Sequence, residues 1–104
     1  MSKPKPISER EFQKQVVALL RLHGFFRIFH PYDSRRSEPG WPDLTAVSVR
    51  QRRVLYLELK TEKGRVSAAQ QDWIDHLTEA GAEAHVVRPS QWRELERIIA
   101  GRDL

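Results

Sequence analysis

The stretch that decides the fold is DLTAVSVRQRRVLYLELK, residues 43–60. Its two halves, 43–49 and 53–60, are rich in branched and aromatic residues, and a short polar segment separates them. This spacing predicts an antiparallel β-hairpin. In the second half leucines alternate with other residues, so the leucines are expected to face the core. The leucines are Leu55, Leu57 and Leu59, and the residues that alternate with them are Tyr56, Glu58 and Lys60.

The register of this hairpin determines which side chains meet. If Gln51 and Arg52 form a two-residue turn, paired residues share a face and the side-chain period is two. Such a turn would place Asp43, Glu58 and Lys60 on the same face. The expected pairs are Val49 with Val54, Val47 with Tyr56, Thr45 with Glu58, and Asp43 with Lys60.

Toward the N-terminus, Ser8 and Glu11 have the spacing of a capping box, and apolar residues then recur at helical spacing as far as Gly24. This pattern predicts a first helix. Residues 25–30 resemble a short strand, whereas residues 31–42 are rich in proline, glycine, serine and charge and predict a long loop.

Toward the C-terminus, Ser67 is expected to cap a second helix that ends near Gly81. Residues 84–88 predict a fourth strand, and residues 91–100 predict a last helix. Because the fourth strand follows a helical crossover, it should lie parallel to a neighbour in the same sheet. The sequence therefore predicts an α/β fold of order αβββαβα, with a mixed four-stranded sheet flanked by helices.

The composition narrows the classes of protein. A chain of 104 residues fits one domain, and we expect residues 1–7 to be a flexible tail and residues 8–104 the domain. The chain has no cysteine, which excludes disulfides, thiolate catalysis and cysteine zinc sites. No apolar run approaches the roughly 18 residues of a membrane helix, and no secretory signal follows the start. A cytoplasmic protein without membrane contact is expected.

The charge favours a polyanionic partner. The net charge is +4, a moderate basic bias. The basic residues gather at three places, although ordinary solvated loops would account for any one of them. The three clusters are Arg35 and Arg36; Arg50, Arg52 and Arg53; and Lys63 and Arg65.

The acids of the hairpin are the unusual feature. Asp43 and Glu58 would lie close together, and two neighbouring carboxylates repel unless a cation lies between them. Mg²⁺ is typically held by one or two carboxylates with water and phosphate, and Lys60 could then stabilise charge that develops on a phosphate. The alternative is an ordinary cross-strand salt bridge between Asp43 and Lys60, with Glu58 solvated.

Further motifs in the same order extend this pattern over nearly the whole chain. The ordered set resembles the Pro-Asp…(Asp/Glu)-x-Lys nuclease superfamily and, within it, the virus-type replication-repair nuclease (VRR-NUC) domain, whose small stand-alone members occur in bacteriophages. The segments that carry the resemblance are SEREFQ (8–13), DSRRS (33–37), GWPDL (40–44), LELK (57–60), GRVSAAQ (64–70) and RPS (88–90).

The resemblance implies a restriction-endonuclease-like core and assigns roles by position. It implies that Asp43 and Glu58 bind metal, that the Leu59 carbonyl adds a ligand, and that Lys60 is catalytic. Two further residues match the family. Glu9 would complete the acidic cluster, with Glu11 as the competing choice and dipole compensation in the first helical turn as the plain explanation. Gln70 would lie near the site, although Ser67 and Gln70 also have capping-box spacing and Gln71 is adjacent.

The implied activity is hydrolysis of DNA phosphodiester bonds with Mg²⁺ or Mn²⁺. The resemblance adds a preference for branched, junction (Holliday) or flap DNA, a role in DNA repair, and the bacterial host cytoplasm if the protein is phage-encoded. Expected DNA contacts are Ser34, Arg35, Arg36, Lys63 and Arg65. The alternative is a non-catalytic DNA-binding module with the same fold. A two-fold homodimer is plausible, since small nucleases that cut both strands often need two sites, but no hydrophobic stripe identifies an interface.

Three other residues lie in or just before the long loop. His30 and Tyr32 precede the arginines of that loop and stay unassigned, because such a histidine is more often structural. Trp41 is the one tryptophan that could stack on a base. The spacing of the four histidines does not predict a zinc site.

Overall fold

The computed structural model describes residues 6–31 and 38–101 of the chain. Its order of elements is the predicted αβββαβα, with a 3-10 turn added before the last helix. The elements are α1 (Glu9–Leu22), β1 (Arg27–Phe29), β2 (Leu44–Ser48), β3 (Arg53–Leu59), α2 (Ala68–Glu79), β4 (Glu83–Val87), η1 (Pro89–Gln91) and α3 (Trp92–Ala100).

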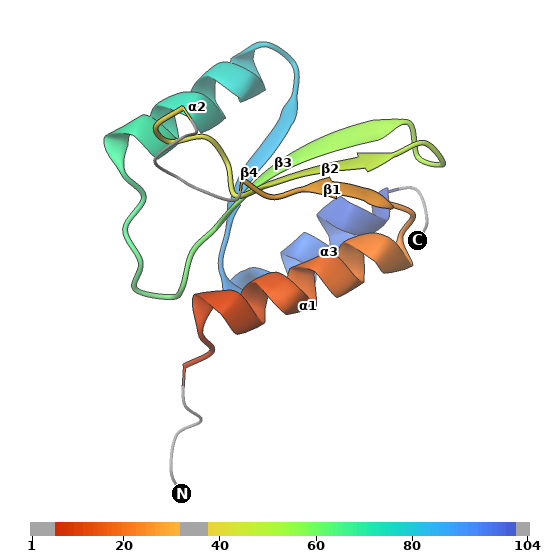
Figure 1. Cartoon of the computed structure of the whole chain (residues 1–104), viewed down its shortest axis with the longest axis horizontal. Coiled ribbons are helices and arrows are strands. Elements are labelled where there is room, and N and C mark those ends of the chain that lie inside the picture. Colours follow the sequence, from red (N-terminus) through yellow and green to blue (C-terminus); the bar gives the residue numbers. More distant parts are fainter. Residues whose placement is uncertain (1–5, 32–37, 102–104) are drawn as a thin grey trace, which may run out of the picture.

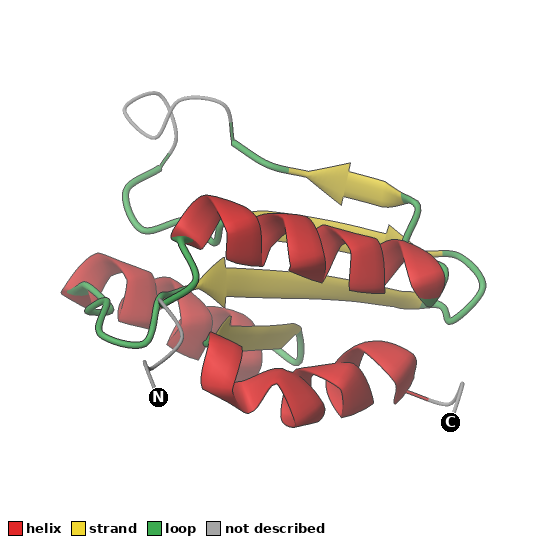
Figure 2. Cartoon of the chain, turned by 90° about the horizontal axis from the view of Figure 1, so that it is seen from below, coloured by secondary structure: helices red, strands yellow, loops and turns green. Residues whose placement is uncertain are grey.

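The four strands form one mixed sheet in the order β1-β2-β3-β4. The first three strands are antiparallel, and β4 pairs parallel to β3. Helices α1 and α3 lie on one face of the sheet and α2 lies on the other (Figure 1). Figure 2, turned to view the molecule from below, shows α1 and α3 side by side in front of the strands. The predicted α/β architecture is thus confirmed.

The hydrophobic core lies between the sheet and the pair α1 and α3. As predicted, Leu55, Leu57 and Leu59 all face it and are fully buried, and burying each such side chain stabilises the fold by roughly 1.5–3 kcal/mol. Strand β2 alternates buried and half-buried residues in the same way. The opposite face of β2 and β3 carries the side chains that alternate with these, Glu58 among them. None of the helices in the described parts of the chain is long and apolar enough to cross a lipid bilayer.

The hairpin register differs from the predicted one by two residues. Ser48 pairs with Arg53, so that the loop contains residues 49–52 rather than a two-residue turn. Arg52 adopts a positive φ of 55°, and its N–H donates to the Val49 carbonyl at 3.2 Å. Ser48 Oγ accepts from the Gln51 N–H at 3.0 Å. These bonds stabilise a longer turn that the sequence Arg-Gln-Arg did not reveal.

A shift of two residues leaves every side chain on its predicted face, because the side-chain period of a strand is also two. The predicted pairing of Asp43 with Lys60 and of Thr45 with Glu58 is nevertheless wrong. Leu44 pairs with Leu57, and one step further along the hairpin Asp43 lies opposite Glu58. The shift therefore brings the two acids directly together.

Strand β1 is shorter than predicted. Residues 25–30 were expected in the strand, but β1 contains only Arg27–Phe29. Phe25 is fully buried in the core, and its N–H donates to the Leu20 carbonyl at the end of α1 at 3.0 Å. Phe25 thus belongs to the turn that leaves the helix.

Candidate active site

Asp43 stands at the start of β2 with its carboxylate fixed by the neighbouring strand. Its Oδ2 accepts a hydrogen bond from the Leu59 N–H at 2.8 Å. The preceding Pro42 is buried, and the backbone of Gly40 lies against the first turn of α2. A Cβ built at Gly40 would lie 2.4 Å from the Ala69 carbonyl carbon. Loop 38–42 and α2 therefore hold the Asp43 carboxylate against the end of β3.

Glu58 is an acid in the interior of the protein. Only 1% of its surface is exposed. Its Oε2 lies 3.4 Å from Lys60 Nζ, whereas its Oε1 is buried without a hydrogen-bond partner. Burial, followed by the nearby Asp43 carboxylate, raises the pKa of Glu58 to about 7, and Lys60 opposes this shift. The geometry leaves one buried oxygen of Glu58 without a partner, in a side chain that a second carboxylate, that of Asp43, already repels.

The structure excludes the salt-bridge alternative in the form predicted. Lys60 contacts Glu58 rather than Asp43, and Glu58 is buried rather than solvated. A lone buried carboxylate costs free energy unless it is paired or coordinates a cation. The contact with Lys60 satisfies one oxygen of Glu58 and leaves the other unsatisfied.

The donor set fits a hard divalent cation. Two carboxylates and a backbone carbonyl are oxygen ligands that Mg²⁺ and Mn²⁺ accept, and the unpartnered Glu58 Oε1 is an oxygen of this kind. Within residues 6–31 and 38–101, no three His, Asp or Glu side chains gather closely enough to hold a metal. Glu9 is not gathered with Asp43 and Glu58 into such a group, and its place in the acidic cluster stays a prediction. Any cation here would rest on Asp43, Glu58 and the Leu59 carbonyl.

A cleft leads to Asp43 from the N-terminal end of α1. Glu9, Arg10, Gln13, His30 and Asp43 line it. Glu9 is exposed in the first helical turn, at the rim of this cleft and apart from the two acids. The competing residue, Glu11, has its carboxylate 4.0 Å from Lys14. Of the two glutamates, Glu9 is the one that faces the site.

A smaller cavity of about 160 Å³ reaches Asp43 from the other side. Gln70, from the first turn of α2, lines it together with His30 and Asp43. Gln70 also forms the predicted capping box, because its Oε1 accepts from the Ser67 N–H at 2.9 Å. Gln71 instead donates to Asp75 at 2.9 Å. Gln70 therefore forms the predicted cap of α2 and also lines the cavity beside Asp43.

Comparison with known proteins identifies the kind of domain that carries this geometry. Residues 5–91 match the VRR-NUC domain family. The chain belongs to that family. A solved structure described as "VRR_NUC domain protein" shares 19% identity with it at a TM-score of 0.61, over 95% of this chain and 88% of the other. At that identity the likeness shows the fold alone. No curated protein matches the chain.

As a VRR-NUC domain, the chain is a nuclease-family domain, and a domain of this family would bind DNA. Of the basic residues expected to contact DNA, Lys63 and Arg65 are exposed in the loop that follows β3. That loop begins directly after Lys60, so both residues belong to the same end of the sheet as the acids. Ser34, Arg35 and Arg36 lie outside the described residues.

Two residues near the site of this VRR-NUC domain have contacts that the sequence did not predict. Trp41 is half-buried and packs edge-on against Trp73 at 4.9 Å and Tyr56 at 5.8 Å, so its ring belongs to the contact between loop 38–42 and α2. The sequence assigns no role to His30, yet His30 lines both cavities beside Asp43. Its Nδ1 lies 2.9 Å from the Pro31 carbonyl. The only sequence signal for His30 is its place just before the long loop.

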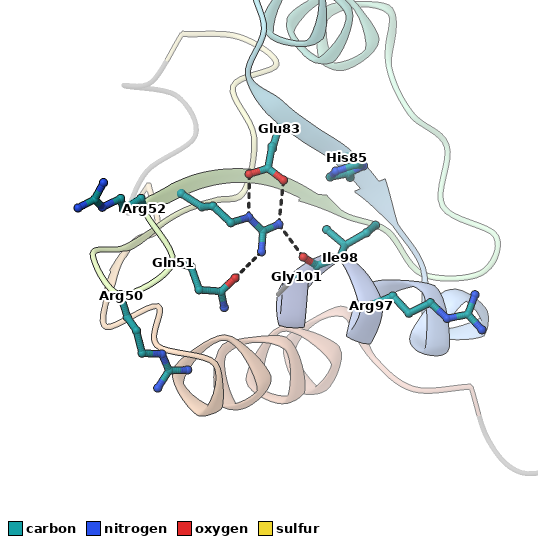
Figure 3. Close-up of a pocket in the computed structure, with 9 residues that line it drawn as sticks. Arg50, Gln51, Arg52, Glu83, His85, Arg97, Ile98 and Gly101 are labelled. Atoms are coloured by element: carbon teal, nitrogen blue, oxygen red, sulfur yellow. Dashed lines mark hydrogen bonds and ion pairs between the residues drawn. The ribbon is translucent and has the colours of Figure 1, made fainter. Parts of the chain in front are cut away.

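A cavity of about 910 Å³ lies at the opposite end of the strands (Figure 3). Arg53 is a structural residue there, because it donates to Glu83 at 2.9 and 2.8 Å and to the Gln51 side chain at 2.7 Å. It also donates to the carbonyls at the end of α3. Figure 3 shows Arg50, Arg52 and Arg97 pointing in different directions. This cavity is formed around a satisfied arginine and is not the candidate active site.

Proposed function

We propose that this VRR-NUC domain is a metal-dependent endonuclease of the Pro-Asp…(Asp/Glu)-x-Lys superfamily that hydrolyses DNA phosphodiester bonds with Mg²⁺ or Mn²⁺. The observation that carries the proposal is the unpartnered Glu58 Oε1, buried opposite Asp43 in a chain of a nuclease family. A protein has little reason to retain this arrangement for stability, because an uncompensated buried charge is destabilising. A cation would supply the missing partner.

In this proposal Asp43, Glu58 and the Leu59 carbonyl hold the divalent ion. When bound, such an ion supplies a Lewis acid for the scissile phosphate and a more acidic water. The hydrogen bond from the Leu59 N–H keeps the Asp43 carboxylate in one orientation. That preorganisation matters because a ligand already fixed in place needs little rearrangement during the reaction.

Lys60 acts on the phosphate in this proposal. Its ammonium lies 3.4 Å from Glu58, so it is next to the acids and at the open end of β3. It stabilises the negative charge that grows on the phosphate as water attacks, or orients that water. Glu9 and Gln70 line the two cavities that meet at Asp43, and we propose that they contribute to the site from either side.

The substrate is proposed to be branched, junction or flap DNA, selected by its shape. Lys63 and Arg65, both exposed beside the end of β3, would contact its phosphates. Ser34, Arg35 and Arg36 are proposed to do the same from the long loop. Such contacts position a nucleic acid without reading its sequence, as selection by shape requires.

The test is incubation of the protein with labelled linear, flap and four-way-junction DNA, in Mg²⁺, in Mn²⁺ and in EDTA. We expect cleavage with either ion, none in EDTA, and faster cleavage of the branched substrates than of the linear duplex. Binding of DNA without cleavage in any ion would contradict the proposal and support the non-catalytic DNA-binding module. Equal cleavage of all substrates would contradict only the selection by shape.

A further inference from the structure

A second basic side chain stands beside Lys60 where the strands end. Strands β3 and β4 are parallel, with Leu59 paired to Val87, and the Lys60 N–H donates to the Val87 carbonyl at 3.0 Å. Arg88 is the first residue after β4 and lies next to Lys60 where the chain leaves the sheet. Ligands of open α/β sheets commonly bind outside the carboxyl ends of parallel strands. Arg88 therefore stands at the edge of the sheet where the proposed substrate would lie.

One nitrogen of Arg88 fastens the loop that follows Lys60. Its Nη1 donates to the carbonyls of Thr61 at 2.5 Å, Gly64 at 2.7 Å and Glu62 at 3.3 Å. The Glu62 carboxylate in turn accepts from the Ser90 N–H. The segment that leads to Lys63 and Arg65 is thus tied to the end of β4.

The rest of the Arg88 guanidinium is unused. Neither Nε nor Nη2 has a partner among residues 6–31 and 38–101. Both nitrogens reach solvent, since the buried unpartnered side-chain atoms of these residues are Thr45 Oγ1 and Glu58 Oε1. No carboxylate of the described residues forms an ion pair with Arg88. The Glu62 carboxylate accepts from the Ser90 N–H instead. The cation keeps a full charge and a free edge.

That free edge has the shape of an anion-binding group. Nε and Nη2 carry two parallel N–H bonds, the arrangement with which arginine binds phosphate through two hydrogen bonds. Fastening backbone carbonyls would need only a donor, and a neutral amide supplies one. The charge and the second edge are therefore left for another partner.

We infer that Arg88 binds a phosphate of the nucleic-acid substrate through Nε and Nη2, beside Lys60, while Nη1 holds the loop of Lys63 and Arg65. This inference rests on the proposed function for the nature of the anion. It makes Arg88 a substrate-binding residue on the side of the site away from α1. The two strand ends would then present adjacent cations, Lys60 and Arg88, to successive parts of the DNA backbone.

The test measures DNA binding in EDTA over a range of salt concentrations, so that cleavage plays no part. The plot of log K against log [salt] has a negative slope, and removing one bond to a duplex phosphate decreases the magnitude of that slope by about 0.9. We expect this decrease in Arg88→Gln and none in Arg97→Gln, which removes one exposed charge from α3 at the far end of the domain. Circular dichroism of each variant checks the fold. An unchanged slope in Arg88→Gln would overturn the inference.

A second background separates direct binding of the phosphate from an effect through the loop. If Arg88 acts only by fastening the loop, Arg88→Gln will not change the slope once Lys63 and Arg65 have been replaced by Gln. Direct binding predicts the same decrease of about 0.9 in that background. An unchanged slope there would assign Arg88 to a purely structural role and overturn the inference.

Arg88→Lys keeps the test decisive if Arg88→Gln does not fold. The lysine retains the charge but offers no paired N–H bonds. We expect the wild-type salt slope with roughly tenfold weaker binding, about 1.4 kcal/mol. Wild-type affinity in Arg88→Lys would contradict the pair of hydrogen bonds to phosphate.

The outcomes also distinguish this inference from the proposed function. Wild-type protein that cuts DNA while Arg88→Gln keeps the wild-type slope overturns the role of Arg88 alone. Protein that binds DNA with the expected decrease in slope but cuts nothing overturns the nuclease proposal alone. Wild-type protein that does not bind DNA overturns both.

Discussion

At the scale of single residues, the surroundings of Glu58 disfavour its ionised form. Glu58 is buried beside another carboxylate, and both features raise its pKa, to about 7. The protein therefore retains an acid whose ionised form opposes folding in the absence of a cation. Such local conflict with stability is typical of functional sites.

The raised pKa of Glu58 predicts how the stability of the metal-free protein depends on pH. The group binds its proton more tightly when folded, with a pKa of about 7 against 4.5 in the unfolded chain. The stability that Glu58 contributes is therefore fully present below about pH 4.5 and is lost as the pH rises to about 7. Urea unfolding in EDTA at pH 5 and pH 8 should show this loss, on the order of 1–3 kcal/mol.

Glu58→Gln is the matched control for this experiment. The pKa of His85 is lowered by burial, so His85 changes stability with pH in the opposite direction, and only the difference between the two proteins isolates Glu58. The variant should lack the loss seen in wild type and should be the more stable protein at pH 8. Equal pH dependence of both proteins would contradict the raised pKa.

At the scale of elements, the sequence predicted which face of the hairpin carries the site, but not the register of its two strands. The leucine alternation in β3 predicted the face of Glu58 and Lys60 correctly, because a period of two does not depend on the turn. The register was wrong because no glycine, asparagine or aspartate marks the turn, and Arg52 adopts its positive φ without such a signal. An error of two residues in the register leaves each side chain on the same face. The prediction that Asp43 and Glu58 lie close together is therefore unaffected by it.

Contacts between elements were not predictable from the sequence. Nothing in the local pattern showed that Lys60 would contact Glu58, that Arg88 would fasten the loop after β3, or that loop 38–42 would pack on α2. These contacts depend on how distant segments approach each other. Periodicity and capping motifs describe only neighbours in the chain.

The contact between loop 38–42 and α2 gives a prediction for Gly40. Its φ is +85°, and a Cβ there would lie 2.4–2.7 Å from backbone atoms of Ala69 and Gln70. Gly40→Ala should therefore lower the free energy of unfolding by more than the roughly 1–2 kcal/mol of the left-handed backbone alone. It should also slow cleavage, because the loop that carries Asp43 must move.

Gly81→Ala separates these two causes. Gly81 has a similar φ of +94°, but a Cβ there meets no atom within 4 Å. The variant should show the cost of the backbone conformation alone and keep wild-type cleavage. Urea unfolding and cleavage rates of both variants decide the matter, and equal losses of stability would refute the role of the loop contact.

At the scale of the whole molecule, packing and chemistry are separated in space. The core between the sheet and helices α1 and α3 supports the strands, and Arg53 ties the hairpin to β4 and α3 at one end. The acids, Lys60 and the cavities beside Asp43 lie at the other end, near the first turns of α1 and α2. The core and the Arg53 contacts support the fold away from the acids, which offsets the cost of burying Glu58.

The family was predictable at this scale because its motifs follow one another in order along the chain. The core was predictable because leucines alternate along β3. The number of acids that gather at the site was not predictable from the sequence. Glu9 matches a helix-one glutamate in sequence, yet it lies at the rim of the cleft rather than with Asp43 and Glu58. A motif gives the order of residues but not the distance between the elements that carry them.

We propose a division of roles in which Asp43 and Glu58 hold a divalent cation and Lys60 acts on the phosphate. Single-turnover cleavage of one labelled DNA, measured while Mg²⁺ is titrated, tests it most directly. We predict that Asp43→Asn and Glu58→Gln abolish metal-dependent cleavage. At saturating Mg²⁺, Lys60→Ala should slow cleavage roughly a hundredfold. Glu96→Gln, an exposed acid of α3, should behave as wild type. Cleavage by folded Asp43→Asn at the wild-type rate and with the wild-type Mg²⁺ dependence would contradict the account.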